Sequence, residues 1–148
     1  MQATTVVTIV VVGLMVGVEL AVAAFVNPIF DRLPEDCGLA ARSDGARVLG
    51  RVMPFWYIGS LVLATAWAVM AWGDAQAVTI AVAAGLLLVS VLMSVVLLVP
   101  INSRSARWSP GQAPADWKQQ RARWDFYHHF RVAVIIAAFA LLVIAGVH

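Results

Sequence analysis

The residues with the clearest chemical potential lie in the stretch WDFYHHFR, residues 124–131. On a helix His128 and Arg131 project from one face, whereas His129 points about 100° away from His128. Histidine can take up and return protons near neutral pH, and arginine can donate hydrogen bonds to a developing negative charge. The spacing predicts a proton-transfer pair at His128 and Arg131, with His129 at headgroup level. The alternative is that all three residues only anchor the helix at the membrane interface.

A carboxylate far away in the sequence belongs to the same hypothesis. Glu19 lies in the first apolar stretch, about 10 Å inside its predicted cytoplasmic end. A charged side chain near mid-membrane costs about 2.5–3.5 kcal/mol, so it usually faces the bundle interior beside a partner. We expect Glu19 to orient or charge-balance His128 and Arg131. The alternative is a protonated glutamic acid that only fixes helix packing.

Three further residues are candidates for binding a ligand. Asn27 shares a helical face with Glu19, although Pro28 disfavours the helical state before it and favours a helix end there. Asn102, in VPIN, closes the third apolar stretch at a similar depth. Trp124 is on the same helical stripe as His128 and is predicted to form a pocket wall. The neighbouring aromatic residues, Tyr57 among them, fit an interfacial belt.

The elements that must position these residues are membrane helices. The chain is 62% hydrophobic and 12% charged, whereas charged residues make up about a quarter of an ordinary soluble domain. Helices are the only spanning option for such stretches, because each backbone donor must be satisfied within its own segment. We predict an all-α fold, one four-transmembrane-helix bundle covering residues 1–148. The predicted spans are 4–26, 52–72, 77–99 and 115–147.

Charge and cysteine content add topology and chemistry. All ten Lys and Arg residues lie in or at the end of the two long connections, around 32–51 and 104–131. The positive-inside rule then places these loops in the cytoplasm and both termini outside, in a cytoplasmic (inner) membrane, with the last helix extended into the cytoplasm. The basic charge thus reports orientation and gives no nucleic-acid footprint. The single cysteine, Cys37, excludes an internal disulfide and Cys-x-x-Cys chemistry.

A ridge of small residues, Gly13, Gly17 and Ala21, follows the first helix at four-residue spacing. Such a ridge permits close approach of another helix. It fits packing within the bundle, and a homodimer seam is the alternative.

Taken together, VPIN, the following DW, and RARWDFYHHFR resemble the anthrone-oxygenase-like family of small four-helix membrane proteins. The resemblance extends over nearly the whole chain, and its core is W-x-x-x-H-x-x-R with a preceding P-x-N. Carried over to this sequence, these motifs fall on Asn102, Trp124, His128 and Arg131, with Glu19 and Pro28 as weaker matches. Relatives often have histidine at position 27, where this chain has Asn27.

The resemblance implies a membrane monooxygenase acting on a small apolar aromatic substrate with dioxygen. His128 is then the base, and Arg131 with Asn102 or Asn27 stabilises an oxyanion. The sequence itself requires no cofactor, and a metal or haem bound through His128 is an alternative. A different class of function is also open: a non-enzymatic membrane subunit or small-molecule binder whose polar residues only pack helices.

Overall fold

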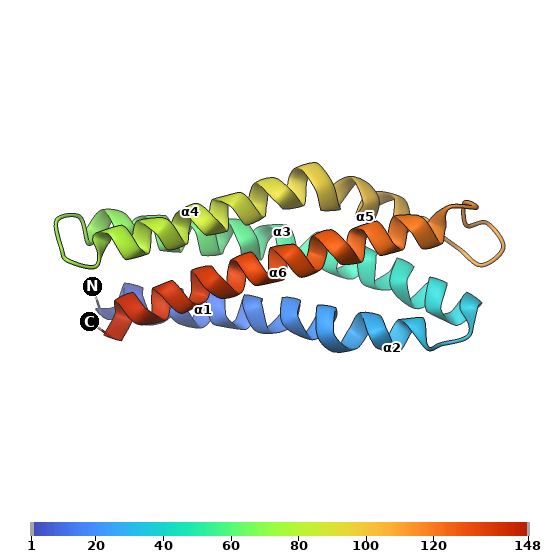
Figure 1. Cartoon of the computed structure of the whole chain (residues 1–148), viewed down its shortest axis with the longest axis horizontal. Helices are drawn as coiled ribbons and strands as arrows, with labels where there is room; N and C mark the ends of the chain where they lie inside the picture. The colour runs from blue at the N-terminus through green and yellow to red at the C-terminus, as the bar shows by residue number, and fades with distance from the viewer. Residues whose placement is uncertain (1, 148) are drawn as a thin grey trace.

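The computed structural model describes residues 2–147, and all regular secondary structure within that range is helical (Figure 1). The elements follow in chain order: α1 (Gln2–Ala21), the π-helical turn η1 (Val22–Val26), α2 (Asn27–Asp31), α3 (Glu35–Met70), α4 (Ala77–Met93), the π-helical turn η2 (Ser94–Leu98), α5 (Val99–Ser105) and α6 (Trp117–Val147).

These elements form four continuous rods that are long and apolar enough to cross a membrane. The rods are Gln2–Asp31, Glu35–Met70, Ala77–Ser105 and Trp117–Val147. Both termini and the short α3–α4 connection lie at one end of the bundle, and the other two connections lie at the opposite end (Figure 1). The chain is therefore an integral membrane protein, and the predicted all-α bundle of four spanning helices is confirmed.

The prediction of a loop before the second span is wrong for most of that segment. Helix α3 begins at Glu35, so residues 35–51 are helical rather than an open basic loop. Glu35 and Asp36 occupy its first turn, where negative charge complements the helix dipole. Hydropathy detects the part of a helix that crosses lipid, and this polar extension carries no such signal.

The predicted helix ends near Asn27 and Asn102 are also wrong, because both rods continue past them. The N–H of Asn27 bonds to the carbonyl of Val22, and the N–H of Val99 bonds to that of Ser94, each across five residues. A proline, Pro28 or Pro100, follows each wide turn closely. Because proline cannot donate the next backbone bond, the rod widens locally rather than breaking.

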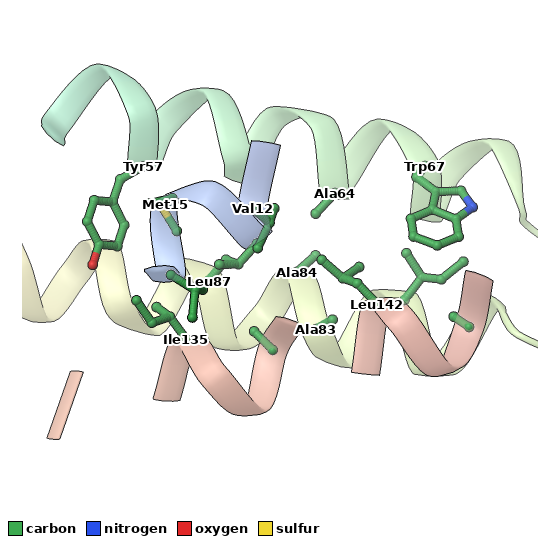
Figure 2. Close-up of a cluster of buried hydrophobic side chains, with 14 of the residues drawn as sticks. Val12, Met15, Tyr57, Ala64, Trp67, Ala83, Ala84, Leu87, Ile135 and Leu142 are labelled. Carbon is green, nitrogen blue, oxygen red and sulfur yellow. The ribbon is translucent and has the colours of Figure 1, made fainter. Parts of the chain in front are cut away.

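The apolar core fills the half of the bundle nearer the termini. Small residues such as Ala64, Ala83 and Ala138 let the helices approach, and Met15, Leu87 and Ile135 fill the space between them. Among the residues labelled in Figure 2, Tyr57 lies at one end and Trp67 at the other, both on α3. The polar residues of interest begin where the core ends, at Tyr57.

The small-residue ridge of α1 contributes to packing inside the bundle. A Cβ placed on Gly13 would lie 3.0 Å from the ring of Phe139, on α6, whereas one on Gly17 would meet nothing within 4 Å. Gly13 therefore admits an aromatic ring of the same chain. The homodimer seam through Gly13, Gly17 and Ala21 stays a prediction.

Candidate active site: a buried Glu–His–Arg cluster

Glu19, His128 and Arg131 meet inside the bundle. Arg131 Nη2 lies 2.7 Å from Glu19 Oε2 and 3.1 Å from His128 Nδ1, and His128 Nδ1 lies 3.2 Å from Glu19 Oε2. All three residues are more than nine-tenths buried. The three side chains expected to share one chamber therefore touch one another.

Helical geometry explains why these residues converge. His128 and Arg131 are three positions apart on α6, and both point inward, whereas His129 is exposed. Glu19 is in the last turn of α1, directly before η1. Burial of a single charged group costs several kcal/mol of lost hydration, and the attraction between a buried carboxylate and a buried guanidinium offsets that cost for both. The ion pair therefore fixes α1 against α6 at this depth.

Arg131 also contacts the other two rods. Its Nη1 donates a hydrogen bond to Ser94 Oγ at 2.8 Å, and its guanidinium carbon lies 4.9 Å from the centroid of the Tyr57 ring. Sequence reasoning missed both partners. Tyr57 is indistinguishable from a belt aromatic in MPFWYIG, whereas Ser94, a polar residue within the apolar run LMSVVLL, offered a weak signal.

Trp124 covers the imidazole of His128. The two rings stack with centroids 4.5 Å apart and planes inclined by 19°. His128 Nε2 and Trp124 Nε1 are buried and have no hydrogen-bond partner within residues 2–147. Both residues line a cavity of about 220 Å³ that is also lined by Glu19, Tyr57 and Arg131. Two residues that line the cavity thus each hold a buried nitrogen that no neighbour satisfies, a feature that needs an explanation and that is compatible with a ligand site.

The two ring nitrogens of His128 have different surroundings. If Nδ1 carries the proton, it can donate to Glu19, and the lone pair of Nε2 is then free to accept a proton. If Nδ1 instead accepts a hydrogen bond from Arg131, Nε2 carries the proton and can donate it. The same contacts therefore support a proton-accepting and a proton-donating form of the imidazole.

Asn27 does not join this cluster. Its amide nitrogen donates to Asp125 Oδ1 at 3.0 Å, and Arg42 binds both oxygens of Asp125, each at 3.1 Å. Arg42 and Arg121 also pair with Asp31, at 2.8 and 3.1 Å. This second network, which sequence reasoning missed, joins α2, α3 and α6 beside a smaller cavity of about 110 Å³.

Asn102 lies between the two cavities. Both cavities are lined by Asn102 and Trp124, so these side chains form part of a shared wall. The amide nitrogen of Asn102 donates to the carbonyl of Ala46 at 3.0 Å. One of its two N–H donors is thus used to hold α5 against α3, and the other is not accounted for by that bond.

His128 is the single histidine that lines either of these two cavities. Within residues 2–147, no three His, Cys, Asp or Glu side chains lie close enough together to hold a metal ion. The exposed His129 makes a different contact, with its Nδ1 2.6 Å from the carbonyl oxygen of Asp125. The structure therefore gives the neighbouring histidines separate environments.

A four-helix membrane protein with a buried acid–base cluster beside a ligand-sized cavity is the class that this fold and site define. The sequence profile of the anthrone oxygenase family matches residues 53–141, more than half of the chain. The chain belongs to the anthrone oxygenase family. No curated protein and no solved structure shows significant similarity to it. The matched region contains the site residues of α3 to α6, whereas Glu19 precedes it. The matched site residues are Tyr57, Ser94, Asn102, Trp124, His128 and Arg131.

Proposed function

We propose that this protein oxidises a small, apolar aromatic ketone of the anthrone type with dioxygen, using His128 as general base. Family membership supports an oxygenase-like role in the membrane. The observation that carries the finer proposal is the imidazole itself. Its Nδ1 is held beside Glu19, its Nε2 is buried without a partner, and His128 lines the chamber together with Trp124.

The first step removes a proton from the ring methylene of the substrate. That C–H bond is acidic because the resulting anion is aromatic and delocalises its charge onto the ketone oxygen. Nε2 of His128 takes the proton, and Glu19 stabilises the imidazolium through Nδ1–H. The cationic Arg131 stabilises the anion, and the second N–H of Asn102 is the proposed further donor to the oxyanion.

Dioxygen then reacts with the carbanion carbon. The carbanion supplies two electrons, a C–O bond forms, and the peroxide takes the proton held by His128. Loss of the remaining hydrogen on that carbon to His128 forms a carbonyl and breaks the O–O bond. The departing hydroxide takes that proton and leaves as water. The balance is one ketone and one dioxygen giving one quinone and one water.

The decisive experiment replaces His128 by glutamine and, as a matched control, His129 by glutamine. In liposomes containing anthrone, we expect H128Q to lose about 100-fold or more in turnover and H129Q to retain it. Oxygen uptake and quinone absorbance give the rates. Metal analysis and visible absorbance of the same wild-type preparation test the alternative of a metal or haem on His128. Equal turnover of H128Q and wild type would refute the proposed base.

A non-enzymatic ligand binder is the second candidate, because the residues that line the cavity include an unpartnered donor, Trp124 Nε1, that the proposed reaction does not use. In that case wild-type protein binds anthraquinone, measured by quenching of tryptophan fluorescence, without consuming oxygen in the presence of anthrone. H128Q would then change affinity alone.

A further inference from the structure

The rod α4–η2–α5 leaves α3 at its π-helical turn. Both α4 and α5 pack against α3, but over the described residues no Cα of η2 lies within 8 Å of a Cα of α3. The turn stays packed against α6. Figure 1 shows the rod bowing outward between α4 and α5. On this side of the bundle the Cα atoms of η2 are therefore more than 8 Å from those of α3.

Some residues that line the larger cavity are also exposed on the outside of the bundle. Ile58 on α3 and Val95 on η2 line that cavity, and yet they are 54% and 60% exposed. Val99, at the start of α5, combines the same two properties. The outer surface of an apolar spanning rod faces hydrocarbon. A side chain that both lines the chamber and faces hydrocarbon marks the rim of an opening.

We infer that the chamber receives its ligand sideways from the lipid phase, through this opening between α3 and η2. The rim side chains of Ile58, Val95 and Val99 are apolar. The other exposed residues that line the chamber, Gly50, Pro54 and Ser103, add no charge and a single hydroxyl, so the rim as a whole is uncharged. It admits an uncharged molecule that dissolves in the bilayer. The smaller cavity differs, because Arg42 and Arg121 line it. The identification of the arriving molecule as a substrate rests on the proposed function. The inference that the chamber opens to the lipid is independent of it.

Enlarging the rim side chains tests the opening. We expect Val95→Trp and Ile58→Trp to lower the rate at limiting anthrone in the bilayer roughly tenfold, because substrate access becomes the slow step. Val96→Trp and Val62→Trp are the matched controls. Both positions are exposed, at 67% and 60%, on the same elements, and neither lines either of the two cavities. Equal rates in rim and control variants would overturn the inference.

A second measurement does not depend on catalysis. In a Cys37→Ser background, Met53→Cys places the only thiol in the chamber wall. We expect lipid-dissolved N-phenylmaleimide to label this introduced thiol roughly tenfold more slowly when Val95→Trp is added than when Val96→Trp is added. Labelling in denaturant confirms that the thiol is reactive in each protein. Equal labelling rates refute the opening, whereas absent turnover with unequal labelling refutes only the proposed reaction.

Discussion

Oε2 of Glu19 binds both ionisable partners of the candidate site, Arg131 at 2.7 Å and His128 at 3.2 Å. A buried guanidinium that lost this carboxylate would keep its charge without compensation. The geometry therefore favours an ionised Glu19 over a protonated residue that only fills space. Under the proposed function, this contact makes Glu19 a positioning residue for His128.

Replacing Glu19 by glutamine separates these interpretations. If Glu19 is ionised, Glu19→Gln should destabilise the protein by about 3–5 kcal/mol, because a buried charge is left unpaired. Unfolding in mixed micelles measures this. Glu35→Gln is the control, since Glu35 forms an exposed ion pair with Lys118, and such pairs contribute about 1 kcal/mol or less. Unchanged stability of Glu19→Gln would indicate a protonated carboxyl, for which glutamine is nearly isosteric.

The central cluster could be predicted from the sequence because buried charges need partners. Glu19 on one span and His128 with Arg131 on another were the ionisable groups at compatible depth. The partner of Asn27 could not be predicted in the same way. Asp125 lies next to Trp124 in a polar stretch, and nothing in its spacing distinguishes it from a solvated carboxylate. The contact of Tyr57 with Arg131 could not be predicted either, because Tyr57 lies among other aromatic residues that fit an interfacial belt.

At the scale of elements, the packing of α5 against α3 includes a close contact between the Asn102 side chain and the backbone at Gly50. A Cβ added to Gly50 would lie 2.7 Å from Asn102 Nδ2. Asn102 would then have to leave the carbonyl of Ala46 or α5 would have to shift. The absence of a side chain at Gly50 thus positions the wall that the two cavities share.

Gly50→Ala should therefore be less stable than Gly59→Ala by about 1–3 kcal/mol, because its methyl group overpacks against Asn102. Gly59→Ala on the same helix is the control, because a Cβ there would meet nothing within 4 Å. Alanine has the higher helix propensity, so this control should be neutral or slightly stabilising. The micelle unfolding assay compares the two. If Gly50→Ala is as stable as Gly59→Ala, Asn102 does not occupy the space beside Gly50.

Sequence patterns predicted the spanning segments better than the helix lengths. Four apolar runs follow directly from hydropathy, but the polar start of α3 and the continuations beyond η1 and η2, into α2 and α5, do not. Whether a proline breaks a helix or induces a π-helical turn depends on tertiary packing around it. Here that packing includes the contact of Ser94 with Arg131.

For the whole molecule, the orientation in the membrane is the main prediction that stays open to test. The basic residues favour a cytoplasmic location for the connections after α2 and α5, with both termini outside. In intact cells a membrane-impermeant maleimide should therefore not label Cys37, which is exposed near the start of α3. Asp74→Cys in a Cys37→Ser background should be labelled, since residue 74 lies in the opposite connection. Labelling of Cys37 in the wild type, together with no labelling of the Asp74→Cys variant, would show that the topology is the opposite one.

Arg131 belongs to α6 and reaches the three other rods through Glu19, Tyr57 and Ser94. During synthesis Glu19 precedes its counter-charge by 112 residues, because Arg131 is on the last of the four spans. Until α6 is inserted, Glu19 lacks this cation, and an unpaired carboxyl in hydrocarbon is costly to keep ionised. The ion pair between Glu19 and Arg131 can therefore form only after all four spans have been inserted.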